Sequence, residues 1–166
     1  QGTFPFNLYF NELYREVQPG WVVFLDDDDV FTSPWALSDL AAQIEQDGSD
    51  PDVMYLWKVW FPEWNTVIPQ RSFGREPTEC DINTSGVCFH VKHLAHATWD
   101  GNKVGDYRVL RRLWEHIPRA VWLDRLSGSA SRQAPARRAW ARRRPVRHRR
   151  AARLHAAHTA APAARG

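Results

Sequence analysis

The 166-residue sequence predicts an α/β domain with a mixed sheet flanked by helices. Along the first 126 residues, segments with helical spacing of apolar residues alternate with continuous apolar runs, which suit strands covered on both faces. This alternation is typical of helices packed against a sheet. The composition, with 43% hydrophobic and 13% aromatic residues, is that of a globular domain and excludes a fully disordered chain.

The elements are placed by this spacing and by the residues that begin and end them. Pro19-Gly20 ends the first helix, and Ser33 followed by Pro34 is typical of an N-cap and a first helical residue. The expected helices span Phe6–Val17, Ser33–Ile44 and Val104–Glu115. The expected strands span Trp21–Leu25, Val53–Phe61, Gly86–Val91 and Ala120–Leu123.

The net charge of +3 combines two stretches of opposite sign. Residues 1–126 hold 11 basic and 19 acidic residues, a net charge of −8, whereas residues 127–166 hold 11 Arg and no acid. We therefore expect a domain over residues 1–126 and an Ala/Arg-rich basic tail over residues 127–166. Three interpretations of the tail stay open: an arm that binds nucleic acid or acidic lipid, a disordered solvated tail, or the product of a frameshift in a GC-rich reading frame. We give the tail no functional weight.

The remaining composition bears on the cellular compartment. Two cysteines, Cys80 and Cys88, are too few for a disulfide scaffold and indicate a reducing compartment. The sequence contains no apolar run of 18 residues, so no transmembrane helix is predicted. It also contains no signal-peptide pattern. We expect a cytoplasmic protein, with peripheral attachment to a membrane left open.

The stretch GWVVFLDDDDVF, residues 20–31, joins an apolar strand to four consecutive aspartates. Two carboxylates about 4 Å apart repel by roughly 4 kcal/mol at an effective dielectric near 20, so the charges must be neutralised or spread into water. If the chain stays extended, Asp26 and Asp28 share one face of the strand, and Asp27 and Asp29 share the other.

A divalent cation beside Asp26 and Asp28 would remove this repulsion, with Asp29 as a candidate further ligand. Mg²⁺ takes one or two carboxylates together with phosphate oxygens and water, and ligands of open α/β sheets sit outside the carboxyl ends of the strands. The stretch therefore predicts a site for a metal-bound phosphorylated ligand. The structural alternative is a charged loop with nothing bound.

A second acidic stretch, WDGNKVGDYRVLRRLW at residues 99–114, has Asp100 and Asp106 on either side of a Gly-containing loop. Asp106 falls at the start of an expected helix, where the helix dipole favours a carboxylate. It is either a first-turn acid with a structural role or a general base. A carboxylate can act as a general base when it lies within hydrogen-bond reach of a substrate hydroxyl.

The stretch INTSGVCFH, residues 82–90, is a polar turn before a strand. The turn either presents backbone N–H groups to a ligand or is a turn and nothing more. His90, His93 and His96 recur at i, i+3 and i+6, which differs from the i, i+4 pair of a helical zinc site. Metal ligation by this set is not favoured, and His90 is its strongest single candidate.

Taken in order, these segments resemble family 2 glycosyltransferases. In that family an Asn-bearing helix leads through a Gly into an apolar strand that ends in an Asp-x-Asp motif. Asn11 (or Asn7), Gly20 and the aspartates 26–29 follow that order. The stretches at 82–90 and 99–114 resemble the family's acceptor-side strand and acidic base motif, and VWLD at 121–124 resembles its late strand. The resemblance covers residues 4–125.

The resemblance implies a GT-A fold, a nucleotide-sugar donor, a saccharide or other hydroxyl acceptor, and Mn²⁺ or Mg²⁺. It implies that Asp26 and Asn11 contact the nucleotide part of the donor, and that Asp28 and Asp26 ligate the metal. Asp106 would be the base that deprotonates the acceptor hydroxyl in an inverting displacement.

The sequence departs from the family in two places. Gly105-Asp106 stands where the family usually has a Glu-Asp pair, so Asp100 is an alternative base. The strand and helix that hold the nucleotide base in the family are missing from the sequence. We therefore expect an unpaired strand edge in the sheet and a fragment of an enzyme with weak or no activity.

Two other classes of function stay open. A metal-dependent nuclease or phosphoryl-transfer enzyme also uses clustered aspartates, but the acidic body of the chain argues against nucleic acid as its partner. A non-catalytic carbohydrate-binding protein would use some of the nine Trp as sugar-stacking platforms, where the alternative is packing in the core.

Overall fold

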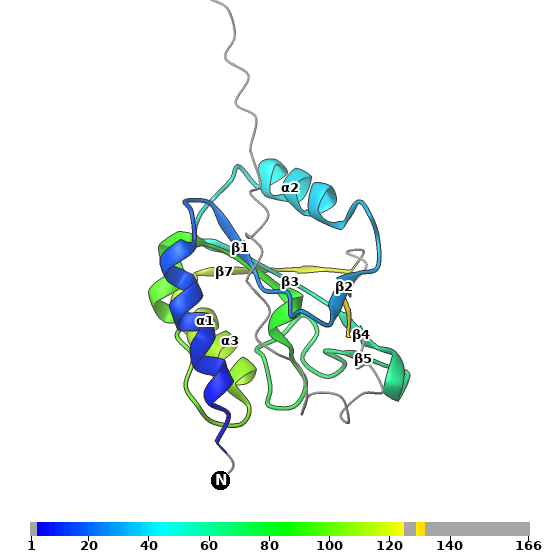
Figure 1. Ribbon diagram of the computed structural model, residues 1–166. Helices are drawn as coiled ribbons and strands as arrows, with labels where there is room; N and C mark the ends of the chain where they lie inside the picture. Colours follow the sequence, from blue (N-terminus) through cyan, green and yellow to red (C-terminus); the bar gives the residue numbers. More distant parts are fainter. Residues whose placement is uncertain (1–2, 125–128, 132–166) are drawn as a thin grey trace, which may run out of the picture. The chain divides into compact units, whose positions relative to one another are not determined.

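The computed structural model describes residues 3–124 and 129–131 (Figure 1). The chain divides into a compact unit, residues 1–134, and residues 135–166, which lie outside the described residues. The predicted tail therefore also lies outside them, except for the backbone of residues 129–131. These three residues form a strand of the compact unit, so the unit continues beyond the expected domain boundary at residue 126.

A mixed four-stranded sheet forms the centre of the compact unit, in the strand order β1-β6-β3-β7. Its strands are β1 (Trp21–Val23), β6 (Val87–His90), β3 (Val53–Trp57) and β7 (Arg119–Leu123). Strand β6 is antiparallel to both of its neighbours and β3 is parallel to β7, so β1, β3 and β7 run in the same direction. The predicted α/β class with a mixed sheet is confirmed.

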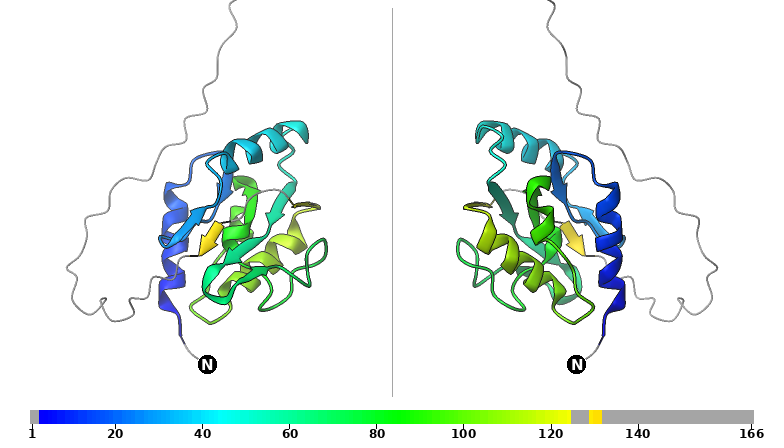
Figure 2. Two further views of the ribbon diagram at one scale, coloured as in Figure 1. Left: turned by 90° about the vertical axis from the view of Figure 1, so that its right-hand side faces the viewer. Right: turned by 90° about the vertical axis from the view of Figure 1, so that its left-hand side faces the viewer.

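Helices cover both faces of this sheet (Figures 1 and 2). The α-helices of the described part are α1 (Leu8–Leu13), α2 (Ala36–Gln46) and α3 (Gly105–His116). Side chains of α1 and α3 pack against one face of the sheet, and those of α2 against the other. In the fully buried strand β3, Met54 and Leu56 face α1 and α3, whereas Tyr55 faces α2. Burial on both faces explains why β3 contains no charged residue.

The first and third helices agree with the sequence pattern. A 3₁₀ turn at Pro5–Asn7, helix α1 and a second 3₁₀ turn at Tyr14–Glu16 follow one another, which confirms the helix predicted over Phe6–Val17. Helix α3 confirms the helix predicted over Val104–Glu115. None of the described helices is long and apolar enough to cross a membrane.

The second helix begins later than predicted. Ser33 opens a turn in front of α2, because its Oγ accepts a hydrogen bond from the Trp35 N–H at 3.1 Å and its carbonyl accepts one from the Ala36 N–H at 3.3 Å. The helix itself starts at Ala36. Ser33 therefore accepts hydrogen bonds from N–H groups at the start of the helix, as an N-cap residue does. The residue directly before the helix is Trp35.

A second four-stranded sheet has the order β2-β8-β4-β5. Its strands are β2 (Asp29–Phe31), β8 (Ser129–Ser131), β4 (Val59–Phe61) and β5 (Thr66–Ile68). The single strand predicted over Val53–Phe61 divides at Lys58 into β3 and β4, which belong to different sheets. Lys58 is the one charged residue of that run, and its Nζ donates to the Asp124 carboxylate at 3.1 Å.

The strand directions define two ends of the main sheet. The carboxyl end of β1 and the first residues of β6 lie at one end, because Val23 pairs with Cys88. The last residue of β6 and the first residues of β3 and β7 lie at the other end. Within residues 3–124 and 129–131, β1 has one strand neighbour, β6. The acidic stretch after β1 and the polar turn before β6 therefore lie at the same end.

Candidate functional site

The four aspartates form a turn and not an extended strand. Strand β1 ends at Val23, and the Asp29 N–H donates to the Asp26 carbonyl at 3.1 Å. The condition under which Asp26 and Asp28 were expected to share a strand face is therefore not met. Asp27 and Asp28 lie at the tip of the turn with their side chains exposed, whereas Asp29 begins β2 and is only 8% exposed.

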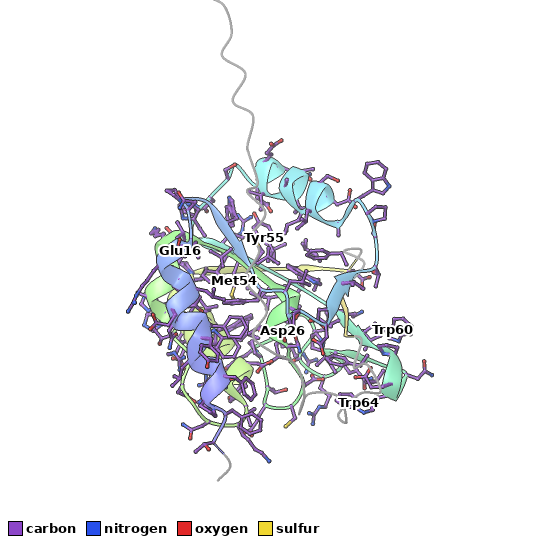
Figure 3. All side chains as sticks on the ribbon, in the orientation of Figure 1. Glu16, Asp26, Met54, Tyr55, Trp60 and Trp64 are labelled. Atoms are coloured by element: carbon purple, nitrogen blue, oxygen red, sulfur yellow. The ribbon has the colours of Figure 1, made fainter. Side chains whose placement is uncertain are left out.

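This turn separates the four charges by environment. The exposed carboxylates at the tip are spread into water, which lowers their mutual repulsion. Asp26, on the segment between β1 and β2 (Figure 3), has an exposed side chain, but protein atoms gathered around its carboxyl group raise its pKa to about 6. The negative charges of Asp29, Asp106 and Asp28 raise that pKa further. The surroundings of Asp26 therefore disfavour its negative charge.

Asp106 comes from the second acidic stretch and lies close enough for its charge to act on Asp26. It occupies the first turn of α3 and is half-buried. Burial raises the pKa of Asp106, and hydrogen bonds from the backbone N–H groups of Asp106 and Thr84 offset part of that rise. Two acidic stretches about 80 residues apart in the sequence are therefore brought to one place, which we name the acidic cluster: Asp26, Asp29 and Asp106.

The 3₁₀ turn Thr84–Gly86 supports this cluster from the start of β6. The Ser85 hydroxyl donates to an Asp29 carboxylate oxygen, and the backbone N–H of Thr84 lowers the pKa of Asp106. Asn83 fixes the turn, because its Oδ1 accepts from the Ser85 N–H at 2.7 Å. The polar groups of this turn therefore serve the acids, a role that neither sequence interpretation of the stretch at 82–90 included.

The turn also requires its glycine. A Cβ atom on Gly86 would lie 2.7 Å from the Trp57 carbonyl oxygen and 3.0 Å from a methyl carbon of Val59. The backbone at residue 86 can approach the ends of β3 and β4 this closely only without a side chain. In the sequence, the Asn-Thr-Ser-Gly turn is the pattern that could have indicated Thr84 and Ser85 as site residues. The turn contacts the acids because β6 pairs with β1.

Asp100, the alternative base, is engaged by an arginine. The Arg108 Nε and Nη2 donate to the two carboxylate oxygens of Asp100 at 2.6 and 2.5 Å. These hydrogen bonds lower the pKa of Asp100 to about 2. A carboxylate with so low a pKa is a weak base, so the structure favours Asp106 over Asp100 for proton transfer.

The two asparagines of the N-terminal helical segment contact the loop before α3. The Asn11 Nδ2 donates to the Trp99 carbonyl and its Oδ1 accepts from the Trp99 N–H, both at 2.8 Å. The Asn7 Nδ2 donates to the carbonyls of Asp100 and Asn102. These contacts join α1 to the loop, and a nucleotide contact by Asn11 stays a prediction.

His90 does not join the acidic cluster. It pairs with Trp21 at the start of β1, and five residues at about 3.3 Å each separate that position from Asp26. Its Nδ1 accepts from the Lys92 N–H at 3.2 Å. His90 lies at the opposite end of the main sheet, so the structure does not bring this candidate ligand together with the aspartates.

The residues of the quartet suit a hard divalent cation by donor type. Asp26, Asp28 and Asp29 offer carboxylate oxygens, the ligands that Mg²⁺ and Mn²⁺ prefer. In the part of the chain that the structure describes, no group of three or more His, Cys, Asp or Glu is placed to hold a metal ion. Mg²⁺ uses one or two carboxylates and completes its shell with water and phosphate oxygens, so it does not require such a group.

Comparisons with known proteins give no further assignment. Neither the models of known protein families nor the curated proteins match this chain. The resemblance to family 2 glycosyltransferases therefore rests on the residues themselves.

Proposed function

We propose that this chain carries the acidic centre of a GT-A-like glycosyltransferase, which transfers a sugar from a nucleotide-sugar donor to an acceptor hydroxyl with inversion. The observation that carries the proposal is the acidic cluster. Asp26 and Asp29 come from one acidic stretch and Asp106 from another, and they lie where β1 ends, the position at which open α/β sheets bind ligands. The mixed sheet with helices on both faces is compatible with a GT-A architecture.

On the donor side, Asp26 would hold Mn²⁺ or Mg²⁺ together with Asp28 or Asp29. The neighbouring negative charges that raise the Asp26 pKa are the reason to expect a cation there, because a cation would relieve them. When bound, the cation would neutralise the charge that develops on the leaving diphosphate.

On the acceptor side, Asp106 is the proposed base. Its half-buried position at the start of α3 raises its pKa, which brings a carboxylate closer to the range in which it can take a proton at neutral pH. The backbone N–H of Thr84 acts on the same carboxylate and offsets part of that rise. In an inverting displacement Asp106 would accept the proton of the acceptor hydroxyl as that oxygen attacks the sugar.

A non-catalytic carbohydrate-binding protein is the second candidate. Three tryptophans have unusually exposed side chains: Trp35 at 68%, Trp60 at 43% and Trp64 at 64%. Trp60 and Trp64 belong to β4 and the turn that follows it (Figure 3). Exposed indole rings can stack on sugar rings without any metal. This candidate requires no contribution from the acidic cluster.

Ligand binding tested by saturation-transfer NMR separates the two candidates. The probes are UDP-glucose, GDP-mannose and dTDP-rhamnose with and without MnCl₂, and cellohexaose without metal. We expect Mn²⁺-dependent binding of at least one nucleotide sugar, because the aspartates of the quartet would hold the donor diphosphate through the cation. Asp26→Asn should weaken this binding at least tenfold, and Asp27→Asn, at the exposed tip of the same turn, should change it less than twofold.

Two results would contradict the transferase proposal. One is the absence of Mn²⁺-dependent binding for every nucleotide sugar. The other is equal binding by the Asp26→Asn protein and the unmodified protein. Binding of cellohexaose that is independent of metal and of Asp26 would instead support the carbohydrate-binding candidate.

A further inference from the structure

The loop before α3 is held by one guanidinium group. In addition to its two bonds to the Asp100 carboxylate, the Arg108 side chain donates to the Lys103 carbonyl at 2.6 Å and to the Asn102 carbonyl at 3.2 Å. Arg108 therefore contacts three residues of the loop at once. The paired bonds to Asp100 have the planar fork geometry that arginine alone provides.

This loop ends in a backbone conformation that needs support. Val104 has a φ of +61°, in the left-handed region that is strongly disfavoured for a β-branched residue. Gly105 and Asp106 follow directly. Such a conformation persists only where the surrounding contacts determine it. The direction in which α3 starts, and with it the position of Asp106, therefore depends on what holds residues 100–104.

A second set of contacts holds the loop from α1 and the residues beside it. Asn7 bonds two of its carbonyls, and Asn11 bonds both backbone groups of Trp99. Gly105 lies so close to Asn7 and Trp99 that it has no room for a Cβ atom. The loop is thus clamped between α1 and the Arg108 side chain of α3.

We propose that Arg108 and Asp100 form a positioning pair that holds the loop in the conformation that places Asp106 beside Asp26 and Asp29. Only the role of Asp106 as a base rests on the proposed function. The claim that the pair fixes the position of Asp106 is independent of that function. It assigns Asp100 a structural partner in place of the base role. It also predicts that Lys cannot replace Arg108, because an ammonium group cannot bond both Asp100 oxygens and two carbonyls with the same planar fork.

Amide hydrogen exchange at Thr84 reports the position of Asp106 without donor, metal or activity. Thr84 belongs to the turn before β6, which packs against α3, and its backbone N–H lowers the pKa of Asp106, but Thr84 does not belong to the loop that Arg108 contacts. In Arg108→Gln and Arg108→Lys proteins we expect the Thr84 amide to exchange at least tenfold faster than in the unmodified protein. Asp100→Asn, a milder change to the same pair, should have an effect of the same sign.

Arg111→Gln is the matched control. Arg111 is also on α3 and also pairs with acids, Glu76 and Glu115, but it does not contact the loop. It should leave Thr84 exchange unchanged. If Arg108→Gln and Asp100→Asn speed amide exchange at Asn102 and leave the exchange rate of Thr84 unchanged, the pair stabilises only its own loop, and the positioning inference is overturned.

Kinetics connect the inference to the proposed function. On the proposed function, Arg108→Gln should lower the kcat of sugar transfer at least tenfold and leave the KM for the donor unchanged. The reason is that the pair positions the base and does not contact the donor. A rise in KM with unchanged kcat would overturn the inference. If no nucleotide sugar binds while Thr84 exchange responds as expected, the proposed function fails and the positioning pair stands.

Discussion

Carboxylates at the two ends of the main sheet have pKa values shifted in opposite directions. At the start of β3, Asp52 accepts hydrogen bonds from the Lys92 Nζ at 2.7 and 2.8 Å, and its Oδ1 lies 3.0 Å from the His93 Nε2. The Lys92 ammonium and His93 lower the pKa of Asp52. At the other end, protein atoms that desolvate the Asp26 carboxyl group, together with neighbouring acids, raise its pKa to about 6 although the side chain is exposed.

This difference separates acids that tie the fold together from acids suited to a ligand. Paired carboxylates such as Asp52 have their charge balanced within the protein. At Asp26 the surrounding groups disfavour the charge, a condition that clusters at functional sites. The comparison therefore predicts opposite responses to neutralising substitutions at the two ends.

The largest expected effect is on catalysis at the acidic end. On the proposed function, Asp106→Asn should lower the rate of sugar transfer by about 10²–10⁴-fold, because an amide cannot accept the acceptor's proton. The measurement is nucleoside diphosphate release with donor and acceptor present. Asp39→Asn is the control, since Asp39 is also a first-turn acid, on α2, but is exposed. Transfer that survives in the Asp106→Asn protein would remove Asp106 from the proposed role.

The next effect is on the packing beneath Asp106. Gly105→Ala should destabilise the protein by about 1–3 kcal/mol, because the added Cβ would lie 2.7 Å from the Asn7 Nδ2 and 3.1 Å from the Trp99 ring. Urea unfolding measures this loss. Gly101→Ala, in the same loop, should cost less, since a Cβ there would meet ordinary contacts no nearer than 3.8 Å. Equal losses at the two positions would show that the close approach is not what matters.

Asp26→Asn should stabilise the metal-free protein. The ordinary pKa of 3.8 rises to about 6 in the folded state, so folding carries a penalty that appears as pH rises through this range and is complete above it. The shift corresponds to about 3 kcal/mol, and screening at this exposed side chain reduces the expected gain to about 1 kcal/mol at pH 7. Urea unfolding in EDTA should show this gain at pH 7 and none at pH 3.5. A loss of stability at pH 7 would contradict the comparison.

The smallest effect is expected at the opposite end. Asp52→Asn should lower the melting temperature slightly at pH 7, because Lys92 and His93 lose a charged partner that is itself partly exposed. The pKa of Asp52 is lowered by folding, so its contribution is present above its ordinary pKa and is lost as pH falls through the folded value. The melting temperatures of the Asp52→Asn protein and the unmodified protein should therefore differ at pH 7 and converge as pH falls through the folded pKa of Asp52. A difference that is independent of pH would point to packing and not to charge.

The sequence predicted those elements that local spacing determines. Helix α3 and the buried strand β3 follow from apolar periodicity and from a run without charges. Strands β2 and β8 have three residues each and pair with one another across about 100 residues of sequence, so no local pattern marks them. The alternation of faces along the aspartates failed because it assumed an extended chain where the Asp26–Asp29 hydrogen bond makes a turn.

Some features of the candidate site were likewise indicated by the sequence, and others were not. The sequence predicted Asp26 and Asp106 as candidate site residues from separate stretches, and the structure places them close enough for the charge of Asp106 to raise the pKa of Asp26. The contact between Ser85 and Asp29 was not expected, because it depends on the register between β6 and β1. The pairing of Asp100 with Arg108 depends on a loop that folds back on its own helix, which spacing cannot reveal.

The contacts around Gly105 constrain how this sequence could change in evolution. A Glu at residue 105, as in the Glu-Asp pair usual in the family that the chain resembles, would bring a Cβ within 2.7 Å of the Asn7 Nδ2 and 3.1 Å of the Trp99 ring. A smaller residue at position 7 or 99 would have to arise first. Among homologues, positions 7, 99 and 105 should therefore vary together, with Gly105 accompanying the bulky pair.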